Sequence, residues 1–253
     1  MSETMVACNF PTRQIARKGL PLRYNRHLTP MKILALDTST EFCSVAVLAD
    51  GELFSREILA GQSHSARLLP LVTEVLAECG LGLADLDGIA FGSGPGSFTG
   101  LRIGCGVAQG LAFGADLPVI GVSTLLALAQ GCAGERVIAC LDARMGEVYH
   151  AAYEKDGEGW REVSGPGLYA PPEAPLPQGA GWVGCGSGFA AYGAALQQRF
   201  GGQLAGVLPD APPRARDMAQ LALPLFLRGE GMDAALAAPL YIRNKVALKT
   251  SER

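Results

Sequence analysis

Residues 33–37 read "ILALD" and residues 138–142 read "IACLD", so one pattern occurs twice in the chain at a spacing of 105 residues. In both copies a short apolar run ends in an aspartate, which is typical of a buried strand that carries a carboxylate to one edge of a sheet. The turn Asp50-Gly51 recurs as Asp156-Gly157, and Asp-Gly favours a tight β-hairpin. These landmarks indicate an internal duplication.

The first copy predicts the element order βββαβαβα. Two β-rich runs follow the first strand, and the Asp-Gly turn joins them into a hairpin. Helical spacing, a buried strand, a second helix and a strand that leads into a helix capped by Ser123 complete the copy. The runs that carry this prediction are residues 33–37, 42–49, 52–59, 63–80, 86–92, 98–113, 117–122 and 123–131.

The second copy is less regular than the first. Between Trp160 and Gly181 the sequence is rich in Gly and Pro and predicts loops. An amphipathic pattern over residues 214–229 predicts a late helix. We therefore expect an α/β fold with two lobes, residues 31–133 and 134–253, each with a mixed sheet flanked by helices, and a C-terminal segment that returns to the first lobe.

The composition is that of a globular chain with reduced cysteines. Hydrophobic residues make up 49% and charged residues 18% of the 253 residues. The seven cysteines include no CxxC pair, and most lie in apolar runs. We therefore expect buried thiols in a cytoplasmic protein, with neither a disulfide framework nor a zinc site.

Residues 1–30 differ from the rest of the chain in charge. They contain five basic residues and one acidic residue, so the remaining residues carry a net charge of −7, whereas the whole chain carries −3. Met31 opens directly onto the first strand, and we expect residues 1–30 to be a disordered extension or the product of an upstream start, with no membrane span. The acidic body argues against a protein that grips a nucleic acid by itself.

Residues 92–104, "GSGPGSFTGLRIG", have the glycine content of a phosphate-binding loop. The P-loop pattern fails because no Gly-Lys pair precedes a Ser or Thr, and the Rossmann pattern fails because Ser97 and Thr99 stand where its third glycine belongs. The nucleophile elbow fails because Pro95 lies two residues before Ser97. A tight turn and a helix capped by Ser97 or Thr99 remain.

Two stripes of small residues mark the helix that follows this turn. Interior glycines cost about 0.8 to 1 kcal/mol each relative to alanine, so tertiary contacts must offset the cost. One stripe can pack on the chain's own sheet and leave the other for a neighbouring chain, or both can be buried within this fold. One stripe is Gly100, Gly104, Ala108 and Ala112, and the other is Gly106, Gly110 and Gly114.

The helical pattern over residues 63–79 is unusually wide. Its apolar residues cover an arc of roughly 160°, more than packing on one sheet needs, so we expect two contact surfaces. Pro70 interrupts the pattern, which predicts either a helix that begins near Leu68 or a kink at Pro70.

A duplicated βββαβα unit with an aspartate after its first strand resembles the plan of actin, the sugar kinases and the Hsp70 ATPase domain, a duplicated ribonuclease H-like fold. In that group, the loops after the first strand of each half hold nucleotide phosphates. The resemblance implies a vestigial nucleotide site, and an ordinary turn at a strand end is the alternative. Its residues would be Asp37, Thr38, Ser39, Asp142 and Arg144.

Several motifs are more specific than this architecture. "ILALDTST", "GSGPGSFTGLRIG", "LDARMGEVYHA" and the terminal "PLYIR" together resemble the TsaB family of bacterial tRNA threonylcarbamoyladenosine biosynthesis proteins, from residue 31 to about 243. The resemblance implies an accessory, non-catalytic subunit that works with the catalytic paralogue TsaD and the ATPase TsaE to modify adenosine 37 of tRNA. It implies only indirect contact with tRNA and no cofactor in this subunit, because Mg-ATP belongs to the partners.

In that family the two helices described above form the face that meets TsaD or, in a homodimer, a second TsaB. The resemblance therefore implies partner contacts at His64, Leu68, Leu69, Val72, Val75, Leu76, Leu101, Gly104, Ala108 and Leu111.

Catalysis by this chain is the competing hypothesis. In TsaD the segment equivalent to "IGVSTLLALA" carries an HxxxH metal motif, and the two matching positions here are Thr124 and Leu128, which do not suit a metal. We therefore expect no metal and no catalytic residue, and a metallopeptidase is disfavoured. The alternative is an independent ATP-dependent transferase or phosphotransferase that uses Asp37 and Asp142 around Mg-ATP.

Overall fold

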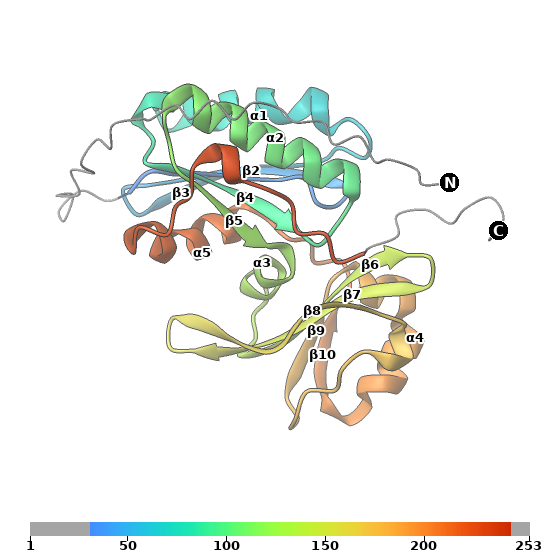
Figure 1. Ribbon diagram of the computed structural model, residues 1–253. Coiled ribbons are helices and arrows are strands. Elements are labelled where there is room, and N and C mark those ends of the chain that lie inside the picture. The colour runs from blue at the N-terminus through green and yellow to red at the C-terminus, as the bar shows by residue number, and fades with distance from the viewer. Residues whose placement is uncertain (1–30, 244–253) are drawn as a thin grey trace, which may run out of the picture.

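The repeated sequence pattern forms two sheets with the same strand order. The computed structural model describes residues 31–243, and Figure 1 shows the sheets as an upper and a lower lobe. The first sheet has the order β3-β2-β1-β4-β5 and the second β8-β7-β6-β9-β10. In each, the first three strands pair antiparallel and the last two run parallel to the first. The bounds are β1 Ile33–Asp37, β2 Phe42–Ala49, β3 Glu52–Leu59, β4 Gly88–Gly94, β5 Val119–Ser123, β6 Arg136–Arg144, β7 Glu147–Asp156, β8 Gly159–Tyr169, β9 Trp182–Cys185 and β10 Leu204–Leu208.

Helices cover both faces of the first sheet. α1 (His64–Glu78) and α2 (Phe98–Ala115) lie on one face, and α5 (Ala215–Leu227) lies on the other. Because side chains alternate along a strand, Leu34 of β1 packs under α1 and α2 while Ile33 packs against α5. The C-terminal part of the chain thus supplies the helix that covers one face of the first sheet.

The second sheet is covered by one helix on each face. α4 (Ser187–Phe200) contacts β6, β9 and β10 on the outer face. α3 (Thr124–Gln130) lies between the lobes and contacts β6 and β7 on one side and α5 on the other. The apolar side chains of α3, such as Leu125 and Leu128, are fully buried, so this short helix joins the two lobes.

The predicted element order of the first copy is confirmed. Ser97 caps α2 by accepting a hydrogen bond from the Gly100 N–H, and Ser123 caps α3 in the same way. α1 begins at His64 and continues through Pro70, so a start near Leu68 is wrong. Within residues 31–243, none of the helices combines the length and the apolar character that crossing a membrane requires.

The prediction of loops between Trp160 and Gly181 is wrong for β8. Register shifts along the β7–β8 pair leave Gly165 and Pro166 without a partner in β7, while Ser164 and Gly167 are paired. β8 is also the edge strand of its sheet. A bulge in an edge strand tolerates a residue that cannot donate a hydrogen bond, so Gly and Pro did not end the strand.

Candidate functional site

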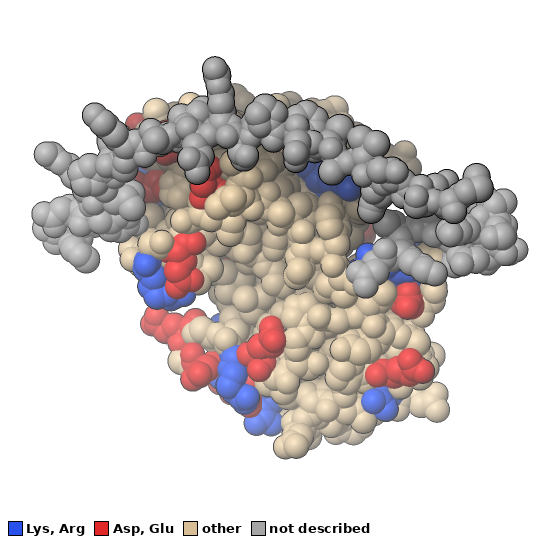
Figure 2. All heavy atoms as spheres, in the orientation of Figure 1, with Lys and Arg blue, Asp and Glu red and all other residues tan. Residues whose placement is uncertain are grey.

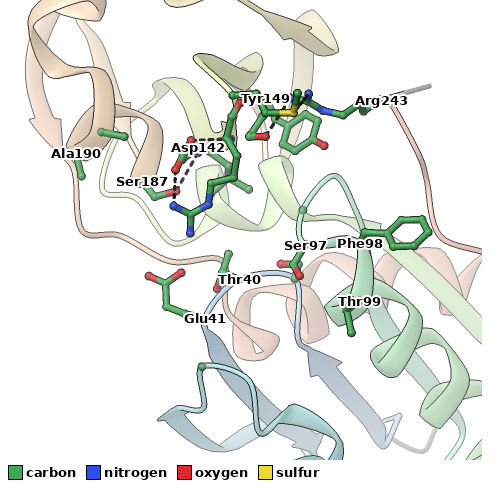
Figure 3. A pocket seen from close by; sticks show the side chains of 18 of the residues that line it. Thr40, Glu41, Ser97, Phe98, Thr99, Asp142, Tyr149, Ser187, Ala190 and Arg243 are labelled. Atoms are coloured by element: carbon green, nitrogen blue, oxygen red, sulfur yellow. Dashed lines mark hydrogen bonds and ion pairs between the residues drawn. The ribbon is translucent and has the colours of Figure 1, made fainter. Parts of the chain in front are cut away.

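A cleft of about 870 Å³ lies between the lobes, where the turns after β1 and β6 approach each other. The first lobe lines it with residues 39–41 and the start of α2, and the second lobe with residues 141–145 and the first turn of α4. Figure 3 shows Thr40 and Glu41 on one side of the cleft and Asp142 and Ser187 on the other.

The turn after β1 is closed by the start of α2. The Ser97 N–H donates to the Ser39 carbonyl at 2.7 Å, and the Thr38 hydroxyl donates to the Gly100 carbonyl at 2.7 Å. A Cβ at Gly100 would overlap the Thr38 carbonyl oxygen, and a Cβ at Gly96 would crowd Ser39. The glycines of "GSGPGSFTGLRIG" therefore serve close backbone packing within the first lobe.

Asp37 lies beneath this closed turn and does not line the cleft. Its Oδ2 accepts the Ser39 hydroxyl at 2.9 Å, while its Oδ1 is buried without a hydrogen-bond partner among residues 31–243. Burial raises the pKa of this carboxyl from 3.8 to about 7. Because this carboxyl does not reach the cleft, it is poorly placed to bridge a metal ion and a phosphate there.

The turn after β6 is open to the cleft, but its carboxylate is engaged by the turn itself. Asp142 Oδ1 accepts the Arg144 N–H at 2.7 Å and the Tyr192 hydroxyl at 3.1 Å, and Oδ2 pairs with the Arg144 guanidinium at 3.1 Å. Arg144 and Met145 have φ of 62° and 56°, which is the left-handed conformation of a tight turn. The arrangement at Asp142 is that of an Asx turn at a strand end.

The cleft brings together only part of the predicted nucleotide site. Ser39, Asp142 and Arg144 line it, whereas Asp37 and Thr38 are buried behind the first turn. Two further lining residues lie in recognisable sequence patterns. Ser187 belongs to "GSG" at residues 186–188, which repeats the "GSG" of residues 92–94, and Arg243 belongs to "PLYIR". Further lining residues that sequence reasoning missed include Thr40, Glu41, Gln62 and Tyr149.

Metal ligands do not converge in the described part of the chain. Within residues 31–243, no three His, Cys, Asp or Glu side chains are placed to hold a metal ion. The Thr124 hydroxyl donates to the Pro95 carbonyl, and Leu128 is fully buried in the core. Both side chains at the HxxxH positions therefore serve packing between β4, α3 and the second lobe.

Most of the predicted partner contacts on α1 and α2 have side chains that are buried within this chain. Leu69 is exposed and Leu111 is half-buried, but the other eight residues are buried within this chain. The first sheet and α2 cover most of the wide apolar arc of α1. The eight buried residues are His64, Leu68, Val72, Val75, Leu76, Leu101, Gly104 and Ala108.

The second stripe of α2 faces outward. A Cβ added at Gly106, Gly110 or Gly114 would meet no atom of residues 31–243 within 4 Å. Large apolar side chains are exposed on the same two helices, since Phe113 on α2 is 75% exposed and Leu69 on α1 is 48% exposed. We call this surface, made of Leu69, Gly106, Gly110, Phe113 and Gly114, the outer α1/α2 face.

Two sheets with one strand order and an interlobe cleft beside their first turns define a protein of the actin-like ATPase fold. A family model described as TsaD, tRNA N6-adenosine threonylcarbamoyltransferase, matches residues 58–250.

Individual relatives show which family of this fold class the chain belongs to. The tRNA threonylcarbamoyladenosine biosynthesis protein TsaB of Escherichia coli is 43% identical, covering 87% of this chain and 97% of that protein. TsaB of Haemophilus influenzae is 42% identical, covering 87% and 96%. The structure of YeaZ from Pseudomonas aeruginosa superposes with a TM-score of 0.78 at 40% identity, covering 84% of this chain and 100% of that one. The chain belongs to the TsaB family.

Proposed function

We propose that this chain is a non-catalytic subunit in the synthesis of threonylcarbamoyladenosine at position 37 of tRNA. It acts by binding a catalytic paralogue of the TsaD type, which works with a TsaE-type ATPase. Mg-ATP and the transfer chemistry belong to these partners, and tRNA meets this chain only indirectly. The names of the relatives, which describe tRNA threonylcarbamoyladenosine biosynthesis, support the pathway.

The observation that carries the binding role is the outer α1/α2 face. Its three glycines leave the backbone of α2 open, and Phe113 and Leu69 expose apolar surface on α2 and α1. A helix without side chains on one face lets another helix approach its backbone closely, as small-residue stripes do where helices pack tightly. The occupant we propose is a helical face of a chain with the same fold, either TsaD or, in its absence, a second copy of this chain.

Three features of the cleft support a non-catalytic role. The first turn is closed by α2, Asp37 is buried away from the cleft, and Asp142 is held by Arg144. An independent ATP-dependent transferase needs these two carboxylates around Mg-ATP. Calorimetry of the isolated chain with Mg-ATP discriminates the two hypotheses, because tight binding that Asp37→Ala removes would favour the transferase.

Substitution of Gly110 by leucine tests the docking role. Gly110→Leu places a bulky side chain in the path of a close-packed partner helix, so we expect TsaD to be lost from co-purification. The isolated chain stays folded, because the new side chain meets open space and leucine favours helix over glycine by about 0.8 kcal/mol. Pull-down of TsaD measures binding, and circular dichroism with thermal melting measures folding.

A matched control is Gly193→Leu in α4, which is also a helical glycine whose Cβ would meet nothing within 4 Å. It lies in the other lobe, so TsaD should still co-purify. A folded Gly110→Leu chain that retains TsaD as well as the control does would refute the docking role.

A further inference from the structure

Arg102 lies one helical turn before Gly106, at the border of the outer α1/α2 face. Its side chain is exposed yet held in place on two sides. The guanidinium carbon stacks 3.9 Å from the centre of the Phe98 ring, and Nε donates a hydrogen bond to the Tyr241 hydroxyl at 3.0 Å. The Phe98 and Tyr241 rings are themselves 5.3 Å apart, so the three side chains form one cluster.

Tyr241 is fixed because the segment around it is fixed. We call residues 237–243 the C-terminal strap. The Gln109 side chain of α2 donates to the Ala237 carbonyl at 3.0 Å, and the Leu240 N–H donates to the Ser93 carbonyl at 2.7 Å. Beyond Tyr241, Arg243 pairs with Glu147 of the second lobe at 2.7 Å. Figure 1 shows the strap crossing from α2 towards the second lobe.

The guanidinium of Arg102 has donors left over. None of the ion pairs among residues 31–243 includes Arg102, and its two terminal nitrogens make no hydrogen bond to these residues. The planar fork of a guanidinium matches a carboxylate, and a side chain that is already ordered loses less entropy on binding. Among residues 31–243, Arg102 is therefore a preorganised, exposed cation with no anionic partner.

We propose that Arg102 binds a carboxylate of the partner chain at one end of the outer α1/α2 face. The inference rests on the proposed function, because it names the chemistry of that docking surface. The partner is a helix that lays small or apolar residues along Gly106 and Gly110 and presents an Asp or Glu to Arg102.

The surroundings of Arg102 favour a carboxylate over the phosphates of a nucleic acid. The outward positions of α2 near Arg102 carry no charge, whereas a phosphate chain needs several cations along its path. On the face shown in Figure 2, Lys and Arg side chains lie mostly next to Asp or Glu and do not form a continuous basic surface. The uncharged positions are Thr99, Ile103, Gly106, Gly110 and Phe113.

Titration calorimetry of the full chain against purified TsaD of the same organism tests this contact. Arg102→Gln should weaken binding about tenfold or more, because a hydrogen-bonded charge pair is lost. Binding by the unsubstituted chain should weaken between 50 mM and 500 mM salt, and binding by Arg102→Gln should weaken less. Arg102→Lys keeps the charge but not the fork, so its affinity should fall between the two.

Two further variants separate the contact from general effects. Arg161→Gln on β8 removes one positive charge far from α2, and its affinity should stay within twofold of the unsubstituted chain. Tyr241→Phe keeps the ring beside Phe98 but removes the hydroxyl that holds Nε, so binding should weaken by about twofold to threefold.

Each outcome decides the inference. If Arg102→Gln binds TsaD within twofold of the unsubstituted chain and with the same salt dependence, the carboxylate contact is refuted. In that case, loss of TsaD binding by Gly110→Leu would still support the outer α1/α2 face as the docking surface. If the unsubstituted chain does not bind TsaD, the proposed function fails and the inference fails with it. Weaker binding of Arg102→Gln to a tRNA transcript, with unchanged affinity for TsaD, would assign the cation to phosphate and also overturn the inference.

Discussion

The two small-residue stripes of α2 share one helix but meet different surroundings. Gly100 and Gly104 press against Thr38, and a Cβ at Gly104 would lie 2.7 Å from the Thr38 hydroxyl oxygen. Gly106 and Gly110 face open space. The chain's own packing therefore requires the first stripe, whereas nothing among residues 31–243 requires the second. Small residues on a helix indicate close approach, but only the structure tells which approach occurs within the chain.

The largest expected effect comes from breaking the buried stripe. Gly100→Ala places a methyl group into the Thr38 carbonyl, so either the turn after β1 or the start of α2 must move. We expect the free energy of unfolding to fall by about 3 kcal/mol or more. Urea denaturation of the variant measures this change, and a loss below about 1 kcal/mol would show that the turn yields easily.

A smaller effect is expected at Asp37, beneath the turn on which the buried stripe packs. The pKa of its carboxyl is raised from 3.8 to about 7 in the folded state. Between about pH 4 and pH 7 the folded state therefore holds a proton that the unfolded state has already released. This contribution to stability is fully present below about pH 4 and is lost as the pH rises through about 7. At pH 8 the buried carboxyl is ionised, which costs free energy in the folded state only. Asp37→Asn removes this cost, so we expect the free energy of unfolding at pH 8 to rise by about 2 kcal/mol.

Comparing the pH dependence of stability in the unsubstituted chain and in Asp37→Asn separates the effect of Asp37 from that of other groups. Asp217 also has a raised pKa, of about 6 owing to burial, and it acts in both proteins. The difference between their denaturation curves at pH 5 and pH 8 therefore reports Asp37 alone. A difference that does not grow between these pH values would contradict the assigned burial of a neutral carboxyl.

The smallest expected effect has the opposite sign and concerns the outer stripe. Gly106→Ala and Gly110→Ala should each raise the free energy of unfolding by about 0.5 to 1 kcal/mol, because alanine favours helix and meets no neighbour at either position. Thermal melting of the two variants measures this gain. Destabilisation by either variant would mean that the outer stripe is packed within the isolated chain after all.

Much of the fold was predictable because its signals are local. The two "LD" strand ends, the two Asp-Gly turns and the caps Ser97 and Ser123 each depend on neighbouring residues only. The surroundings of α1 were not predictable, because they depend on residues far away in the sequence. The spacing of Leu68, Val72 and Val75 gives the width of the apolar arc of α1, but it does not tell which elements cover that arc.

The candidate site shows the same limit. Asp37 and Asp142 follow equivalent strands, yet one is buried and the other lines the cleft. The difference arises because α2 closes the first turn, whereas the Asx turn at Asp142 remains open. The contact between Arg102 and Tyr241 joins residues 139 positions apart, and no local pattern encodes such a pair.

The place of α5 in the first lobe sets an order for assembly during synthesis. β1 is made early, but the helix that covers one face of its sheet begins only at Ala215. Until that helix leaves the ribosome, Ile33, Ala35, Ile120 and Val122 lack their apolar partners. The first lobe therefore cannot complete its core before the second lobe has been synthesised, and the growing chain carries an uncovered sheet through most of its translation.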